Sequence, residues 1–297
     1  MRIVSLLPAA TEIVAALGLR DCLVGRSHEC DHPDDVRELP ALTKARIDLS
    51  LPSAELDAQV RRIVAQRLPI YMLDEARLSG LAPDVVVTQE ACEVCAISYQ
   101  QVVGSLKGTA PAARIVSLRP ARLADVIEDV RAVAAACGVS PRGEALAASL
   151  GERLARTAAA VPSGPRPRVA VVEWLAPPML AGHWVPDAIE AAGGVPLGPP
   201  AGAASPGSSW DEIRALRADA IVVAPCGFDL SRTRAEAEPL LELLRSLAAR
   251  VLLLDGNAYL NRPGPRLVDA VEIIAAWLRG SPVPAEQGIS LEPAVVA

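Results

Sequence analysis

Two loops of the sequence hold side chains that could bind a metal ion. One contains the pair Cys92-x-x-Cys95, and the other contains His28, Cys30 and His32. A set of thiolates and imidazoles is typical of zinc or cluster sites, whereas a Cys-x-x-Cys pair alone is also typical of redox proteins. If the two loops meet, His28, Cys30, Cys92 and Cys95 are the candidate metal ligands. If they do not, the same residues line a ligand cleft.

A neutral imidazole also suits cobalt or iron that a bound cofactor holds. His28 is the candidate for such an axial ligand in the first half of the chain, and His183 is its rival in the second half. A solvent-exposed loop histidine is the alternative for both. Glu29 and Glu90 lie in the same two loops of the first half and are candidate ligand contacts.

The sequence contains no motif that indicates catalysis. There is no G-x-G-x-x-G after a predicted strand, no phosphate-binding loop, no G-x-S-x-G and no H-E-x-x-H. We therefore expect a binding protein rather than an enzyme, with no catalytic cofactor.

The few aromatic residues lie mostly between predicted strands and helices. Aromatic residues make up 3% of the chain, and we expect most of those in the second half to lie in loops. They indicate a flat, largely apolar ligand, although packing against the sheet ends is the alternative. These candidate contacts are Trp174, Trp184, Trp210, Phe228 and Tyr259.

Apolar runs alternate with helical patterns along the whole chain. The runs predict strands at residues 2–7, 22–25, 70–73, 85–87, 114–118, 168–172, 220–224 and 251–254, and the tail from Ser281 has no clear period. Strands separated by helices predict an α/β fold with parallel sheets covered on both faces. Ligands of such sheets bind beyond the carboxyl ends of the strands.

One segment in the middle of the chain predicts a long helix. It begins with Ser140 and Pro141, and Leu146, Leu150 and Leu154 recur on one face before the proline-rich stop. We interpret the helix, residues 140–161, as a spine that joins an N-terminal lobe (1–139) to a C-terminal lobe (162–297). The ligand cleft would then lie between two Rossmann-like lobes; the alternative is one more crossover helix in a single domain.

Composition excludes several classes of partner. The net charge is −6 and only two residues are lysine, so we expect no nucleic acid as a partner. No apolar run approaches the ~20 residues of a membrane span, so we expect no direct membrane insertion. Because residues 2–7 already predict a strand, we expect a cytoplasmic protein, or a periplasmic or surface-anchored one if the chain is trimmed.

The order of motifs resembles the substrate-binding proteins of vitamin B12 and ferric-siderophore ABC transporters. The similarity spans roughly residues 2–280. The residues that match are 2–12 (RIVSLLPAATE), 24–25, 27–31 (SHECD), 82–86 (APDVV), 177–182 (PPMLAG), 193–194 and 262–266 (RPGPR). In that family two Rossmann-like lobes are joined by one long helix. Residues 27–31 together with 88–95 (TQEACEVC) look like the cobalamin-binding branch.

The resemblance implies reversible binding of a corrinoid, with cobalamin as the bound ligand. Carried over residue by residue, it gives Pro8, His28 and Glu29 as contacts from the first lobe. From the second lobe it gives Met179, the loop 205–210 with Ser209 and Trp210, and Asn257, Tyr259 and Arg262. Cys30, Glu90, Cys92, Trp174, His183, Trp184 and Phe228 complete the predicted contacts.

The sequence departs from the family at two positions that concern the partner. Transporter-linked members have a glutamate near a helix start in each lobe, and the matching positions here are Ala76, beside Glu75, and Asp211, beside Glu212. This favours an intracellular corrinoid carrier or sensor over delivery to an ABC permease. We expect a monomer. The alternatives are a haem or ferric-siderophore binding protein, and a metal-binding protein that uses the Cys92/Cys95 loop.

Overall fold

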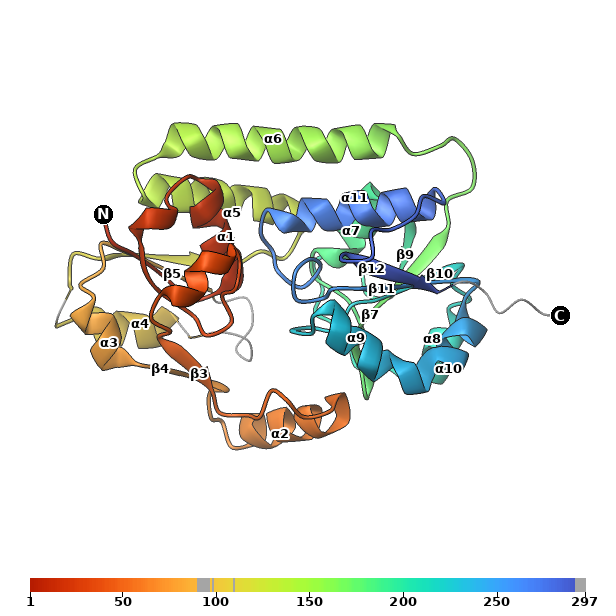
Figure 1. Ribbon diagram of the computed structural model, residues 1–297, viewed down its shortest axis with the longest axis horizontal. Helices are drawn as coiled ribbons and strands as arrows, with labels where there is room; N and C mark the ends of the chain where they lie inside the picture. The colour runs from red at the N-terminus through yellow and green to blue at the C-terminus, as the bar shows by residue number, and fades with distance from the viewer. Residues whose placement is uncertain (90–96, 98, 109, 292–297) are drawn as a thin grey trace. The chain divides into compact units, whose positions relative to one another are not determined.

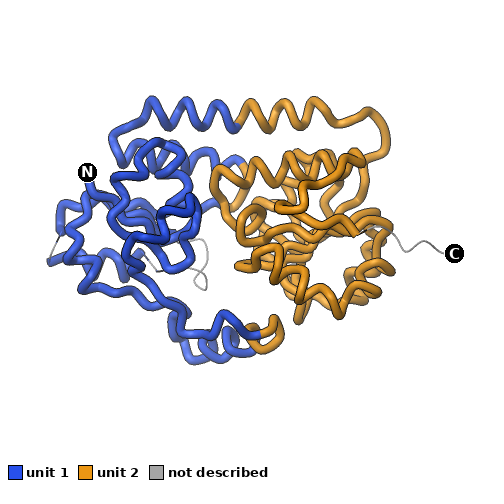
Figure 2. Tube along the Cα trace, viewed as in Figure 1, with its two compact units in different colours: residues 1–51, 58–120, 124–150 blue, residues 52–57, 121–123, 151–297 orange. Residues whose placement is uncertain are grey.

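The structure is a computed structural model of the chain and describes residues 1–89, 97, 99–108 and 110–291 (Figure 1). It divides into two compact units (Figure 2). Unit 1 comprises Met1–Leu51, Ala58–Pro120 and Ala124–Leu150, and unit 2 comprises Pro52–Asp57, Ala121–Leu123 and Gly151–Ala297.

Unit 1 is an α/β unit with short connections. Its strands are β1 (Ile3–Ser5), β2 (Leu23–Arg26), β3 (Thr43–Ala45), β4 (Tyr71–Leu73), β5 (Val85–Gln89) and β6 (Arg114–Leu118). Its helices are α1 (Pro8–Ala16), α3 (Glu75–Gly80), α4 (Tyr99–Leu106) and most of α5 (Leu123–Ala136), with short 3-10 turns at Arg20–Cys22 and Asp34–Glu38. Helix α2 (Ser53–Ala65) and helix α6 (Ser140–Ala159) each divide between the units.

The main sheet of unit 1 has the strand order β2-β1-β5-β6, and every neighbouring pair is parallel. Its central strands, β1 and β5, are buried on both faces, so they consist mostly of apolar and β-branched residues. Val4, Val86 and Leu6 pack with Leu78 of α3 and Val102 of α4. Figure 1 shows α1 and α5 on the opposite side of this sheet from α3 and α4.

A separate two-stranded ribbon, β3 paired antiparallel with β4, also belongs to unit 1. Thr43 lies opposite Leu73 and Ala45 lies opposite Tyr71. Leu42, directly before β3, donates its N–H to the carbonyl of Arg26 at the end of β2. The ribbon therefore places Thr43 and Tyr71 close to the segment that follows β2.

Unit 2 is built around a mixed sheet. Its strands are β7 (Arg168–Leu175), β8 (Pro178–Leu180), β9 (Val195–Leu197), β10 (Ala220–Val223), β11 (Arg250–Leu254) and β12 (Gly288–Leu291). Its helices are α7 (Val185–Ala191), α8 (Trp210–Ala215), α9 (Leu230–Ala237), α10 (Leu241–Leu247) and α11 (Arg266–Leu278), with a 3-10 turn at Glu238–Leu240.

The sheet of unit 2 has the order β12-β11-β10-β7-β8, and β9 also pairs with β7. One side of the sheet, with Val172, Val223 and Leu253, packs on Ile213 of α8 and Leu244 of α10. Figure 1 shows α7 and α11 on the other side. Both faces of the central strands are therefore covered, as in other α/β sheets.

Helix α6 contributes its first half to unit 1 and its second half to unit 2 (Figure 2). In unit 1, Arg142 donates to the carbonyl of Leu17, and Gly143 approaches α5 so closely that a Cβ there would lie 2.4 Å from that of Ala134. In unit 2, Arg153 pairs with two carboxylates of α11. The sequence-based prediction of a two-lobe α/β fold with a long joining helix is confirmed.

Two details of the predicted fold are wrong. The sheets are not parallel throughout, because β8 and β12 pair antiparallel with β7 and β11. The segment from Ser281, whose sequence predicts no element, also contains a strand: residues 288–291 form β12, and Trp277 of α11 donates its ring N–H to the hydroxyl of Ser290. An antiparallel edge strand needs no crossover helix, so the helical periodicity that indicated the other strands is missing there.

Candidate functional site

Unit 1 has three neighbouring parallel strands whose carboxyl ends share one edge of the sheet, namely β2, β1 and β5. Pro8 lies three residues beyond β1, where it begins α1, and His28 lies two residues beyond β2. Glu90, Cys92 and Cys95 follow β5 but lie outside the described residues. The topology thus confirms that Pro8 and His28 follow adjacent strands of one edge.

His28 is held by hydroxyl groups beside it. Its Nδ1 lies 2.6 Å from Oγ1 of Thr43, and its backbone N–H donates to the same oxygen at 3.0 Å. The hydroxyl of Ser27 is also 3.0 Å from Oγ1 of Thr43. Nε2 of the imidazole is shielded from solvent and has no hydrogen-bond partner among the residues that the structure describes.

The imidazole of His28 packs against an aromatic ring that is tied to an acid. The ring centroids of His28 and Tyr71 are 5.1 Å apart, and the phenol of Tyr71 donates to Oε1 of Glu29 at 2.8 Å. All three residues are partly exposed. Together they form a histidine, phenol and carboxylate set directly after β2, which we call the unit 1 cluster.

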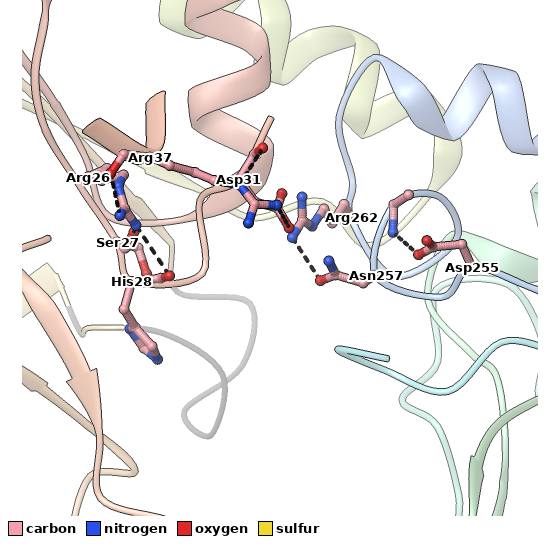
Figure 3. Close-up of polar contacts among 9 residues, drawn as sticks. Arg26, Ser27, His28, Asp31, Arg37, Asp255, Asn257 and Arg262 are labelled. Carbon is pink, nitrogen blue, oxygen red and sulfur yellow. Dashed lines mark hydrogen bonds and ion pairs between the residues drawn. The ribbon is translucent and has the colours of Figure 1, made fainter. Parts of the chain in front are cut away.

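Arg26 holds the backbone of this segment from behind. Its guanidinium donates to the carbonyls of Ser27 and His28, and also to that of Arg37, while the imidazole points away from it (Figure 3). Burial, and secondly the positive charge of Arg26, lowers the pKa of His28. The imidazole is therefore neutral near pH 7, which is the form that can bind a metal ion.

Cys30 does not belong to this cluster. It is only 1% exposed, and the hydroxyl of Thr11 lies 3.0 Å from its sulfur. Its predicted contact with a ligand or a metal stays a prediction, and the other candidate ligands Cys92 and Cys95 lie outside the described residues. Over the described part of the chain, no three Cys, His, Asp or Glu side chains lie close enough to hold a metal ion.

Unit 2 presents an aromatic group at the carboxyl ends of β7 and β10. The rings of Trp174 and Phe228 are 5.2 Å apart, and the guanidinium of Arg232 lies 3.7 Å from the centre of the Phe228 ring. Phe228 is 1% exposed, whereas Trp174 is partly exposed. Phe228 therefore packs beneath the exposed face of Trp174, and its direct contact with a ligand stays a prediction.

The loop after β11 adds a polar pair to the same edge. Arg262 donates to Oδ1 of Asn257 at 2.7 Å (Figure 3). The backbone N–H of Asn257 donates to the carbonyl of Phe228. Arg262 is only 5% exposed, whereas Asn257 and Tyr259 are partly exposed. Arg262 therefore orients the amide of Asn257, and its own contact with a ligand stays a prediction.

Three further predicted contacts lie near β8 and the start of α7. Met179 of β8 lies opposite Trp174 of β7. His183 has a φ of +51°, and its ring lies 5.6 Å from that of Trp184, which donates its ring N–H to the carbonyl of Leu260. Burial lowers the pKa of His183. All of these predicted residues are partly exposed.

The segment before α8 serves mainly to begin that helix. Ser209 and Glu212 form a capping box, in which each side chain accepts the backbone N–H of the other residue. Trp210 packs against the hydrophobic core of unit 2. Ser209 is exposed and Trp210 is partly exposed, so both predicted contacts reach the surface.

Sequence analysis missed four residues that shape these two groups: Arg26, Thr43, Tyr71 and Arg232. Thr43 and Tyr71 come from an antiparallel ribbon rather than from a strand end of the main sheet. The strand-end rule therefore could not find them. Arg232 lies four residues beyond Phe228, within α9, and its basic side chain was the one signal available in the sequence.

Across residues 1–89, 97, 99–108 and 110–291, no helix combines the length and apolar character that crossing a bilayer requires.

The chain matches the family model described as periplasmic binding protein over residues 3–242. Comparison with curated protein sequences gives no match.

Solved structures of three bacterial proteins share the fold. A periplasmic heme binding protein of Pseudomonas aeruginosa is 24% identical with a TM-score of 0.71, covering 97% of each chain. The periplasmic heme-binding protein RhuT of Roseiflexus sp. RS-1 is 23% identical with a TM-score of 0.70, covering 94% of this chain and 98% of that one. The periplasmic vitamin B12 binding protein BtuF of Vibrio cholerae is 20% identical with a TM-score of 0.67, covering 94% and 96%.

Proposed function

The chain belongs to the periplasmic binding protein family, and we propose that it binds a corrinoid, cobalamin, reversibly and without catalysis. The similar structures include proteins that bind vitamin B12 and proteins that bind haem, both of which are large metal-bearing tetrapyrroles. The residues at the sheet edges are the basis for preferring the corrinoid to haem.

The observation that carries the proposal is the group at the strand ends of unit 2. A partly exposed indole, Trp174, rests on the buried ring of Phe228, and the amide of Asn257 lies on the loop that is bonded to Phe228. A corrin has broad apolar faces and a rim of amide side chains. Burial of its face on an aromatic surface, with amide-to-amide hydrogen bonds at the rim, favours this ligand.

The unit 1 cluster would supply a second set of contacts. His28, Glu29 and Tyr71 together offer an imidazole, a carboxylate and a phenol at one sheet edge. That one ligand contacts the edges of both units at once stays a prediction. Substitutions made separately in each unit test it, because both would then weaken binding of the same molecule.

A titration with cyanocobalamin tests the proposal. All four tryptophans lie in unit 2, so quenching of their fluorescence by the absorbing corrinoid reports binding directly. We expect a Kd below about 1 μM and coloured protein after gel filtration. Protein that stays colourless at micromolar concentration would rule the proposal out.

A matched pair of variants locates the binding surface. Trp174→Leu should raise the Kd about tenfold or more, because the indole is the exposed part of the aromatic group. Trp277→Phe also removes one indole, but that indole is only 1% exposed, so the Kd should stay unchanged while stability falls. Equal effects of the two substitutions on the Kd would place the ligand elsewhere.

Haem is the second candidate, and a specific observation favours it. The phenol of Tyr71 stands beside a carboxylate and an imidazole, and phenolates and imidazoles both bind iron in haem proteins. Haemin and cyanocobalamin should therefore compete in the same titration. Binding of haemin more than about tenfold tighter than that of the corrinoid would make haem the ligand.

Carriage within the cell, as opposed to delivery to an ABC permease, is also a proposal. Glu212 accepts hydrogen bonds from the backbone N–H and hydroxyl of Ser209 and from the hydroxyl of Ser208. Its carboxylate therefore already has hydrogen-bond donors within unit 2. Glu75 is exposed at the start of α3. Co-purification with a permease, or recovery in a periplasmic fraction, would decide for delivery.

A further inference from the structure

The hydroxyl of Thr43 has three polar neighbours within hydrogen-bonding distance, and it cannot play the same role toward all of them. Its oxygen lies 3.0 Å from the backbone N of His28, 3.0 Å from the hydroxyl of Ser27 and 2.6 Å from Nδ1 of His28. A hydroxyl has one proton to donate and two lone pairs that accept. The backbone N–H of His28 occupies one lone pair, so the other two neighbours must take opposite roles.

Two arrangements of protons satisfy this set. In the first, Thr43 donates to Nδ1 and Ser27 donates to Thr43, which leaves the imidazole proton on Nε2. In the second, Thr43 donates to Ser27 and accepts a proton from Nδ1, which leaves Nε2 bare. In both arrangements the hydroxyl of Ser27 can also accept the backbone N–H of Glu29, which lies 3.4 Å away. The direction of the bond between the two hydroxyls therefore sets the tautomer of His28.

The unpaired atom indicates which arrangement a ligand would use. Nε2 is shielded and has no hydrogen-bond partner among the described residues, and a buried polar atom without a partner is costly. A proton there would be an unmet donor, whereas a bare nitrogen has a lone pair to give. Neutral imidazole nitrogen is a good ligand for cobalt and similar metals.

We propose that Nε2 of His28 coordinates the cobalt of the bound corrinoid, and that Thr43 and Ser27 are positioning residues that keep the proton on Nδ1. This inference rests on the proposed function. The lone pair of Nε2 forms the bond to cobalt and a water molecule leaves the metal. The imidazole stays neutral, and the oxidation state of the cobalt does not change. Because Nε2 is shielded, we expect coordination to follow first binding as a slower step.

Cobinamide, a corrinoid without the nucleotide base, is the probe that tests the proposal. It has no nitrogen base of its own, so an axial nitrogen in the complex must come from the protein. With cobinamide reduced to the paramagnetic cobalt(II) form, we expect the paramagnetic resonance spectrum to show each cobalt line split into a triplet. Protein labelled with nitrogen-15 should change the triplet to a doublet, and His28→Ala should abolish the splitting.

The two hydroxyls are tested by three further variants. Thr43→Ser keeps the hydroxyl and should keep the splitting. Thr43→Val removes the hydroxyl. Ser27→Ala removes the only other acceptor for the Thr43 proton within this set, so Thr43 must donate to Nδ1 and the imidazole proton stays on Nε2. Both should reduce the coordinated fraction about tenfold, the effect of one unmade hydrogen bond, while cobinamide still binds. Thr43 is buried, so circular dichroism checks the fold, and the Ser27→Ala and Thr43→Ser pair suffices if Thr43→Val unfolds.

The outcomes separate this inference from the proposed function. Tryptophan quenching by cobinamide without any nitrogen splitting would overturn cobalt coordination and leave corrinoid binding standing. Full splitting in Ser27→Ala would overturn the role of the hydroxyl pair. Absence of both quenching and splitting with every corrinoid would refute the proposed function itself.

Discussion

Replacement of Arg153 with methionine removes the ion pairs that hold the second half of α6 to α11. The guanidinium donates from Nε and Nη2 to the two oxygens of Glu272 at 2.9 and 2.6 Å, and from Nη2 to Asp269 at 2.5 Å. These bonds, those with Glu272 first, raise the pKa of Arg153, so it stays charged at every accessible pH. Methionine keeps the apolar stem of the side chain and removes only the charge and the donors.

The magnitude follows from the geometry and the exposure. Buried charge-assisted hydrogen bonds contribute roughly 1.5–3 kcal/mol each, whereas exposed ion pairs contribute only about 0–1 kcal/mol. The three side chains here are 27%, 37% and 40% exposed, which is intermediate. We therefore expect the free energy of unfolding of unit 2 to fall by about 2 kcal/mol. With a denaturant slope of ~2 kcal/mol per molar urea, the midpoint falls by about 1 M.

Tryptophan fluorescence during urea unfolding measures this change, because all four tryptophans lie in unit 2. Arg156→Met is the matched control one turn along the same helix. Arg156 and its partner Glu152 are 69% and 74% exposed and 3.8 Å apart, so this variant should change the free energy by less than about 0.5 kcal/mol. In 1 M NaCl the difference between the two variants should shrink. Equal midpoints for both variants would refute the reasoning.

Three other substitutions test separate parts of the structure. Gly256→Ala would place a Cβ 2.2 Å from the carbonyl oxygen of Pro225 and displace the loop of Asn257, so corrinoid affinity should fall about tenfold. Gly151→Ala, in helix α6, has open space around the new Cβ and should bind normally in the same titration. Burial, and secondly the charge of Asp125, raises the pKa of Asp129 to about 7, so the stability of the native protein declines as the pH rises through 7 and this carboxyl ionises. Asp129→Asn should therefore stabilise unit 1 by on the order of 1–2 kcal/mol at pH 8 and by little at pH 4. Circular dichroism in urea at the two pH values measures this, and an unchanged pH profile would contradict it. Glu212→Gln should lower the melting temperature, because it weakens the α8 capping box at a cost of about 1 kcal/mol. The Kd for cyanocobalamin should stay unchanged, and a higher Kd would mean that α8 takes part in binding.

The sequence predicted those parts of the fold that repeat one pattern. Apolar runs followed by helical periodicity gave the central parallel strands of both units and the long helix α6. The edge strands β8, β9 and β12 have three or four residues each, too few to show a period, so nothing in the pattern separated them from loops. Short edge strands form because a neighbouring strand offers free hydrogen-bonding groups, which is a tertiary effect.

The candidate site was predictable in position but not in orientation. A residue type cannot show whether a side chain after a strand faces outward or packs beneath its neighbours. Phe228, Cys30 and Arg262 follow strands as expected, yet each is 5% exposed or less. Asn257 and His28 also follow strands, and Trp174 lies at the end of one, yet all three are partly exposed. The difference lies in packing against Arg232, Thr11 and Asn257, which the spacing of residues does not reveal.

The physical reason for a site at these edges also explains what escaped prediction. Within a parallel strand that is covered on both faces, a polar side chain would lose its hydrogen bonds to water, so the strands themselves are apolar. The first residues beyond the strand are the earliest that can be polar without that loss, and Ser27, His28 and Asn257 occupy such places. Their partners obey no such rule, because any element that packs beside the edge can supply them. Thr43 and Tyr71 come from the β3–β4 ribbon, and the hydrogen bond of Leu42 to the end of β2 brings that ribbon to the edge. Sequence therefore locates the chemistry at a strand end, and only the fold identifies the second hydroxyl and the phenol that determine how His28 can act.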